Sequence, residues 1–181
     1  MQRASHALLH DGGVWLIDPV DAEGLDERLA ELGPVRGVIQ LLDRHPRDGA
    51  ALAARHRVPL HALPHEGVPG APFTTIVLAD RRWWREVALW WPERRALVVA
   101  EAVGTAPYFL VPGRRIGLHP VMRLAPPRKL GALEPEHLLP GHGTPVSGPD
   151  VADELRWAIA HSRRDLPRVL GAMARGRRRA T

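Results

Sequence analysis

The sequence predicts an α/β fold, because short apolar segments of strand type alternate with helical segments along much of the chain. Its 181 residues are enough for one well-buried core. Hydrophobic residues make up 45% of the chain and charged residues 25%, as is usual for a globular domain. We therefore expect one domain over residues 1–170, followed by a basic, disordered tail over residues 171–181.

The first third of the chain alternates strands and helices. Asp11-Gly12-Gly13 separates two apolar runs, which is typical of a hairpin, and Asp21 is the expected N-cap of the first helix. We expect strands at residues 5–10, 14–18, 35–42 and 58–63, and helices at residues 25–32 and 49–57. Strands separated by helices predict parallel pairing with crossover connections.

The rest of the chain begins with strands at short spacing and ends with a helix. The expected strands are residues 74–79, 86–91, 96–100 and 137–139. Residues 107–127 are rich in Pro, Gly and Arg and are expected to form loops. Ser147 with Asp150 resembles a capping box, and apolar residues from Val151 on share one helical face. Pro167 should break or kink that helix.

Cysteine content and charge restrict the cellular compartment and the partners that we expect for the protein. The chain has no Cys, which excludes disulfides and thiolate metal sites and is compatible with the cytoplasm that we expect. No apolar segment is long enough for a signal peptide or a membrane span. Four Arg residues of the tail account for most of the net charge of +5. This tail is a solvated terminus or, alternatively, a contact for nucleic acid or an anionic membrane.

Two loops carry residues that could do chemistry. Leu42-Asp43-Arg44-His45-Pro46-Arg47-Asp48 follows a predicted parallel strand, at the sheet edge where open α/β sheets bind ligands. Leu138-Leu139-Pro140-Gly141-His142-Gly143 also follows a strand. Its glycines allow a close approach of the backbone and aim the imidazole of His142.

In order and spacing, residues 5–146 resemble the metallo-β-lactamase superfamily. The run Val-Trp-Leu-Ile-Asp-Pro at residues 14–19 resembles its second strand, and the Pro-Gly-His-Gly loop is the most specific match. The loop at residues 42–48 stands where the family has its His-x-His-x-Asp-His metal motif. The resemblance implies a single-domain, four-layer αβ/βα sandwich with metals at one edge.

The family's metal-binding positions are altered in this chain. His45 and His142 match family histidines. Asp43 replaces the first loop histidine, Arg47 the loop aspartate and Asp48 the last loop histidine. In addition, Glu101 replaces the bridging aspartate, and the third metal-binding histidine falls near Arg82.

The altered set still suits one metal ion. Zn²⁺ accepts imidazole nitrogen and carboxylate oxygen, and Fe²⁺ or Mn²⁺ would also be compatible. The expected ligands are Asp43, His45, Asp48, Glu101 and His142. A metal-activated water would attack an ester, thioester, lactone or amide of an unknown small-molecule substrate, with Asp48 or Glu101 as the general base.

Two other interpretations stay open. Arg47 or Arg82 could neutralise the carboxylates in place of the metal, leaving a degenerate, non-catalytic binding or structural protein. A nucleic-acid protein using the Arg tail is the third. Tryptophans at residues 83, 84, 90 and 91 indicate either a strand covered on both faces or an aromatic wall beside the cleft. His61, His65 and His119 are expected to be surface or core residues, unrelated to the two loops.

Overall fold

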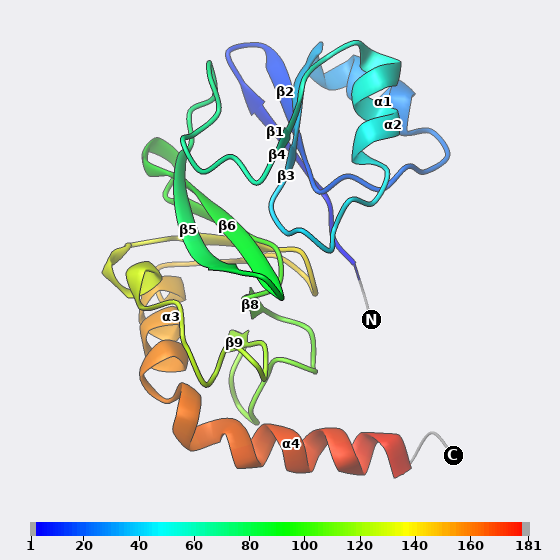
Figure 1. The fold of residues 1–181 in the computed structure, drawn as a ribbon. Coiled ribbons are helices and arrows are strands. Elements are labelled where there is room, and N and C mark those ends of the chain that lie inside the picture. The colour runs from blue at the N-terminus through cyan, green and yellow to red at the C-terminus, as the bar shows by residue number, and fades with distance from the viewer. Residues whose placement is uncertain (1–2, 179–181) are drawn as a thin grey trace. The chain divides into compact units, whose positions relative to one another are not determined.

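The computed structural model describes residues 3–178, which form two compact units. One unit spans Ala4–Pro92, and the other runs from Glu93 onward and includes Arg3. Each unit combines helices and strands, so the predicted α/β class is confirmed (Figure 1).

A four-stranded sheet forms the framework of the Ala4–Pro92 unit. Its strands lie in the order β1-β2-β3-β4. They are β1 (His6–His10), β2 (Gly13–Ile17), β3 (Val35–Gln40) and β4 (Leu60–Ala62). β1 pairs antiparallel with β2, and β2, β3 and β4 pair in parallel. The hairpin and the parallel crossovers are therefore as predicted.

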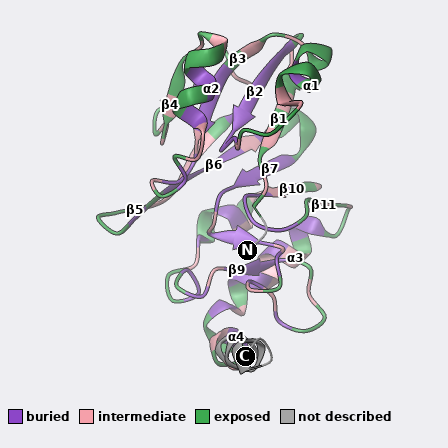
Figure 2. Cartoon of the chain, turned by 90° about the vertical axis from the view of Figure 1, so that its right-hand side faces the viewer, coloured by how far each residue is buried: buried purple, intermediate pink, exposed green. Residues whose placement is uncertain are grey.

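Two helices cover one face of this sheet: α1 (Leu25–Leu32) and α2 (Gly49–His56). A buried cluster joins them to the strands through Val14, Leu16, Leu29, Val38 and Ala53. Figure 2 shows that β2 is buried along its length. Fully burying one Val or Leu side chain contributes about 1.5–3 kcal/mol, so this cluster is a main source of the unit's stability.

The start of α1 differs from the prediction. Gly24, in a left-handed conformation, stands at the N-cap, and no side chain caps the helix. Asp21 instead binds the guanidinium of Arg55, which holds the pKa of the Asp21 carboxyl below its usual value. The predicted cap was wrong because α1 begins at Leu25, so Gly24 and not Asp21 occupies the N-cap position, and Asp21 pairs with a residue distant in sequence.

A long antiparallel hairpin completes this unit. It consists of β5 (Thr74–Arg81) and β6 (Trp84–Trp91), with a bulge between Val77 and Ala79. Trp84 and Trp91 are buried although they stand on opposite faces of β6, whereas Trp83 is exposed. This pattern favours the interpretation of a strand covered on both faces.

The second unit is built around two parallel strands. These are β7 (Ala96–Val99) and β10 (His137–Pro140), and β11 (Val146–Ser147) pairs antiparallel with β10. A small antiparallel pair consists of β8 (Val103–Gly104) and β9 (Gly117–Leu118). Short 3-10 helices lie at η1 (Pro92–Arg94) and η2 (Arg128–Ala132).

Two helices follow these strands, α3 (Val151–Ala160) and α4 (Ser162–Arg178). The predicted face of α3 is buried, but Asp150 at its N-cap makes no side-chain cap and binds Arg115 instead. The helical path is interrupted at His161, and Pro167 lies within α4. No helix in the described part of the chain is long and apolar enough to cross a membrane.

The predicted boundary before residue 171 falls inside α4. The backbone remains helical up to Arg178, whereas residues 179–181 lie outside the described residues. Whether the tail is disordered and dispensable for folding therefore stays a prediction.

A buried arginine holds the loop region of the second unit. Arg123 is 2% exposed and donates hydrogen bonds to the carbonyl oxygens of Leu118, at 3.1 Å, and Phe109, at 2.7 Å. Burial lowers the pKa of Arg123, and the charge of Asp165 opposes that shift. The guanidinium thus links two segments of a loop with little regular structure.

We predict that Arg123→Met lowers the free energy of unfolding by about 2–4 kcal/mol, because it leaves two buried carbonyl oxygens without a charged donor. Urea unfolding would measure the change. Arg128→Met is the matched control, because Arg128 is exposed and should change stability by less than about 0.5 kcal/mol. Equal effects of the two substitutions would contradict this role of Arg123.

Candidate functional site

The loop after β3 is held in place by β6. Leu41 accepts a hydrogen bond from the N–H of Val87 at 2.9 Å, and the N–H of Asp43 donates to the carbonyl of Arg85 at 3.1 Å. Arg44 lies over Trp84, with 4.2 Å between its guanidinium carbon and the ring centroid. The loop that carries the predicted ligands is therefore an ordered extension of the sheet.

A buried carboxylate orients His45. Asp18, 3% exposed, directly follows β2, and its Oδ2 lies 3.2 Å from Nδ1 of His45. Its Oδ1 accepts the N–H of Leu41 at 2.8 Å. In metal sites a carboxylate commonly fixes a ligating imidazole in this way, so that the other ring nitrogen can bind the metal.

One carboxylate oxygen of Asp43, Oδ1, is buried without a hydrogen-bond partner among the described residues. The other oxygen, Oδ2, lies 3.8 Å from Nε of Arg85, an arginine that sequence analysis did not consider. A buried, unsatisfied oxygen is costly, and a cation at Oδ1 would remove that cost.

The remaining predicted residues of this loop have structural partners. Oδ2 of Asp48 accepts the N–H of Asp21 at 2.9 Å. Arg47, at a positive φ of 43°, donates to the carbonyl oxygens of Ala4 at 2.6 Å and Asp18 at 2.7 Å. Arg82 is exposed. The contacts found for Arg47 connect the loop to the start of the chain.

In the second unit, Glu101 and His142 follow the carboxyl ends of neighbouring parallel strands. β7 leads to Glu101 and β10 leads to His142, and the N–H of Gly141 donates to Val99 at 2.8 Å. A Cβ on Gly141 would collide with the carbonyl of Ala100. The expectation that glycine permits a close backbone approach in this loop is therefore confirmed.

The imidazole of His142 is buried beside a phenyl ring. His142 is 6% exposed, and its ring stacks on Phe109 with 6.0 Å between the centroids and 25° between the planes. Gly143 adopts a φ of 101°, and the N–H of Thr105 donates to the carbonyl of His142 at 3.1 Å. These contacts fix the orientation of the His142 imidazole, which the sequence only implied.

Sequence analysis missed the role of His119. Its Nε2 lies 3.2 Å from the hydroxyl of Tyr108 and 3.8 Å from Oε1 of Glu101, and its Nδ1 accepts the N–H of Val121 at 3.2 Å. A neutral His119 therefore carries its proton on Nε2, toward Glu101 and Tyr108. No local signal indicated this grouping, because Glu101 and His119 lie 18 positions apart in the sequence.

These residues do not form a complete metal-binding group within either unit. Asp43, His45 and Asp48 share one loop, and Glu101 and His142 follow adjacent strands. Among the described residues, no cluster of three or more His, Cys, Asp or Glu side chains is arranged to hold a metal ion. The five ligands predicted from the sequence therefore remain a prediction.

Comparison with solved structures identifies the fold. The metallo-β-lactamase BLEG-1 aligns over 81% of this chain and 89% of its own, with a TM-score of 0.59 and 16% identity. FIM-1 from Pseudomonas aeruginosa, in its mono-zinc form, aligns over 88% of this chain and 84% of its own, with a TM-score of 0.58 and 10% identity.

The chain has the metallo-β-lactamase fold. TTHA1623, solved in a di-iron-bound form, also shares it, covering 81% of this chain and 90% of its own with a TM-score of 0.55 and 18% identity. Neither protein-family models nor curated proteins matched the sequence. The predicted metallo-β-lactamase-like fold is confirmed, and at these identities the likeness extends to the fold alone.

The Pro-Gly-His-Gly loop of this metallo-β-lactamase fold should tolerate no side chain at Gly141. We predict that Gly141→Ala lowers the free energy of unfolding by about 1–3 kcal/mol, because the methyl group meets the backbone of Ala100. Gly131→Ala is the control, since its Cβ would lie at an ordinary 3.8 Å from Ile159. Denaturant unfolding compares the two, and a neutral Gly141→Ala would contradict the prediction.

Proposed function

We propose that this protein is a cytoplasmic hydrolase that uses one metal ion to cleave an ester, thioester, lactone or amide of a small molecule. One observation carries the proposal. In the loop after β3, a buried carboxylate orients the imidazole of His45, while Oδ1 of nearby Asp43 is buried with no hydrogen-bond partner among the described residues. An oriented imidazole and an uncompensated carboxylate oxygen suit a divalent cation.

The proposed ligands are those of the sequence-based set, and they differ in how well their surroundings suit the role. His45 and Asp43 are supported by the contacts just described. His142 and Glu101 are supported by their positions at the ends of adjacent parallel strands. Asp48 receives the least support, because Oδ2 of its carboxylate already accepts a backbone hydrogen bond.

We assign proton transfer to Glu101 in preference to Asp48. A bound divalent metal would lower the pKa of a water molecule and polarise the substrate carbonyl. Glu101, 16% exposed in its side chain, would accept the proton released from that water. His119, with its Nε2 proton directed toward Glu101 and Tyr108, would orient the carboxylate.

A second candidate function is a non-catalytic binding or structural protein in which arginine replaces the metal. The observation that favours it is the approach of Arg85 to Asp43, at 3.8 Å. Arg85 is about half exposed, so this single ion pair is weak and screened by salt. For this reason we rank the non-catalytic binding or structural protein below the metal-dependent hydrolase.

The two candidates predict different zinc titrations. In the metal-dependent case, wild-type protein purified without chelators binds one equivalent of Zn²⁺, and His45→Ala and His142→Ala abolish binding. Asp18→Asn should weaken binding about 10–100-fold, because it removes the carboxylate that orients His45. Isothermal titration and elemental analysis measure the stoichiometry and the affinity. Hydrolysis of a panel of chromogenic esters, thioesters, lactones and amides then tests the proposed reaction class.

His65→Ala is the matched control, because His65 is an exposed histidine of the same unit. If arginine replaces the metal, wild type binds no Zn²⁺ and Arg85→Gln gains affinity. Two tightly bound equivalents would contradict the proposal of one metal. Retained stoichiometric binding after loss of both histidines would show that the metal binds elsewhere.

A further inference from the structure

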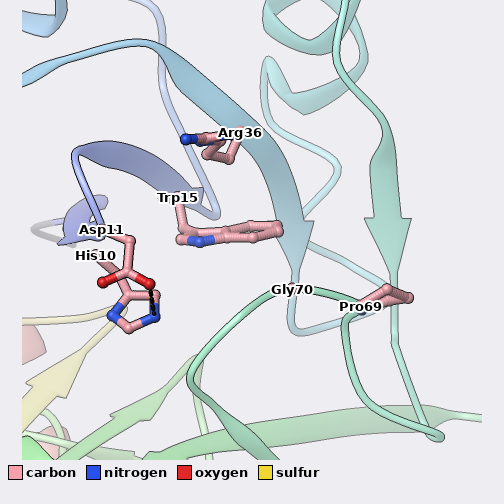
Figure 3. Close-up of a pocket in the computed structure, with 6 residues that line it drawn as sticks. All are labelled: His10, Asp11, Trp15, Arg36, Pro69 and Gly70. Atoms are coloured by element: carbon pink, nitrogen blue, oxygen red, sulfur yellow. Dashed lines mark ion pairs between the residues drawn. The ribbon is translucent and has the colours of Figure 1, made fainter.

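A cavity lies within the Ala4–Pro92 unit, near the start of β2 and away from Asp18 at its end. It has a volume of about 330 Å³ and is lined by His10, Asp11, Trp15, Arg36, Pro69 and Gly70 (Figure 3). This volume falls at the lower end of the range for small-molecule sites. None of the residues proposed to bind the metal lines it.

A bulge places Arg36 at this cavity. Val14 pairs with Val35, but Trp15 pairs with Gly37, so β3 contains one extra residue at Arg36. Val35 and Val38 consequently both pack on the side that the helices cover. Such bulges commonly redirect a side chain, and here Arg36 joins Trp15 on the opposite face of the sheet.

Two glycines make room for this arrangement. A Cβ on Gly13 would collide with the side chain of Arg36. A Cβ on Gly37 would lie 2.7 Å from the ring of Trp15. Neither glycine needs a positive φ, so their function is to let Arg36 and Trp15 lie close against the strands.

Aromatic packing holds Trp15, which lines the cavity, in place. Trp15 is 5% exposed and packs against His61 and Phe73, with ring centroids 6.1 and 6.4 Å away. Trp91 extends this group, with centroids 5.4 Å from Phe73 and 5.7 Å from His10. The small exposed part of the Trp15 ring is therefore apolar and held in one orientation.

Arg36 is the permanent cation at this cavity. Asp11 pairs with His10, with 3.2 Å between Oδ2 and Nε2 (Figure 3). Among the described residues, the exposed guanidinium of Arg36 has no ion pair or hydrogen bond. A planar guanidinium binds a carboxylate through two parallel hydrogen bonds.

We propose that this cavity binds a small organic acid with a flat apolar body. The carboxylate pairs with Arg36, and the body lies against the edge of Trp15 and against Pro69. The bulge and the two glycines place the guanidinium of Arg36 near Trp15, and a bound carboxylate would give that guanidinium a partner. This proposal is independent of the metal site and stands whether or not the protein is a hydrolase.

Benzoate is the probe, and benzyl alcohol is its neutral counterpart with the same ring. At constant ionic strength, ligand-observed NMR should show that the wild-type full chain binds benzoate with a dissociation constant of about a millimolar. Benzyl alcohol should bind about tenfold more weakly or not at all, because it lacks the charge that Arg36 recognises.

Arg36→Gln should weaken benzoate binding about tenfold or more. Arg28→Gln is the control, because Arg28 is an exposed arginine on α1 and does not line the cavity. Gly13→Ala keeps every charge but displaces the Arg36 side chain, so it should also weaken binding. Circular dichroism verifies that each variant is folded.

Two results would overturn the proposal. One is the absence of benzoate binding to the wild type at concentrations well above millimolar. The other is equal binding by the wild type and the folded Arg36→Gln variant. Zinc stoichiometry should be the same in Arg36→Gln and wild type, so a failure here is distinguishable from a failure of the proposed hydrolase.

Discussion

The Ala4–Pro92 unit depends on one buried residue, Asp18, which directly follows β2, one of the two inner strands of its sheet. Its carboxylate binds the N–H of Leu41 and faces His45, while its backbone N–H donates to Ile39 at 2.9 Å. Its carbonyl accepts hydrogen bonds from Ser5 and Arg47. A positive φ of 44° allows these groups to diverge. The end of β3, the start of the chain and the predicted ligand loop are thereby connected at one point.

Within the loop at residues 42–48, some charged side chains hold the backbone in place, whereas others could bind a metal. Arg47 and Asp48 form hydrogen bonds that hold backbone segments together, so their charges serve the structure. Asp43 has a buried oxygen without such a partner among the described residues, and it stands two positions before His45, whose ring is oriented by Asp18. A buried acceptor left without any partner would cost about 1–3 kcal/mol. A bound water molecule or cation is one physical explanation for a buried acceptor of this kind.

Elements defined by local pattern could be predicted from the sequence, whereas long-range pairing could not. The hairpin turn at Asp11–Gly13, the buried strand β3 and the amphipathic face of α3 followed from turn chemistry and hydrophobic period. The cap at Asp21 and the pairings of Asp18 with His45, Asp43 with Arg85 and Glu101 with His119 involve residues distant in sequence. For such pairs a single sequence gives only residue types, and the fold decides which of them meet.

Gly141 and Gly13 have different structural roles, because one contacts rigid backbone and the other contacts a flexible side chain. Gly141 lies against a backbone carbonyl, so the close approach there joins two strand ends and cannot relax around a side chain. Gly13 lies against the movable stem of Arg36, and the space it leaves is filled by a charged group. The first substitution strains the fold, whereas the second changes where a cation stands. The absence of a side chain thus allows the histidine loop to approach the backbone of Ala100 in one case, and allows Arg36 to lie at the cavity in the other.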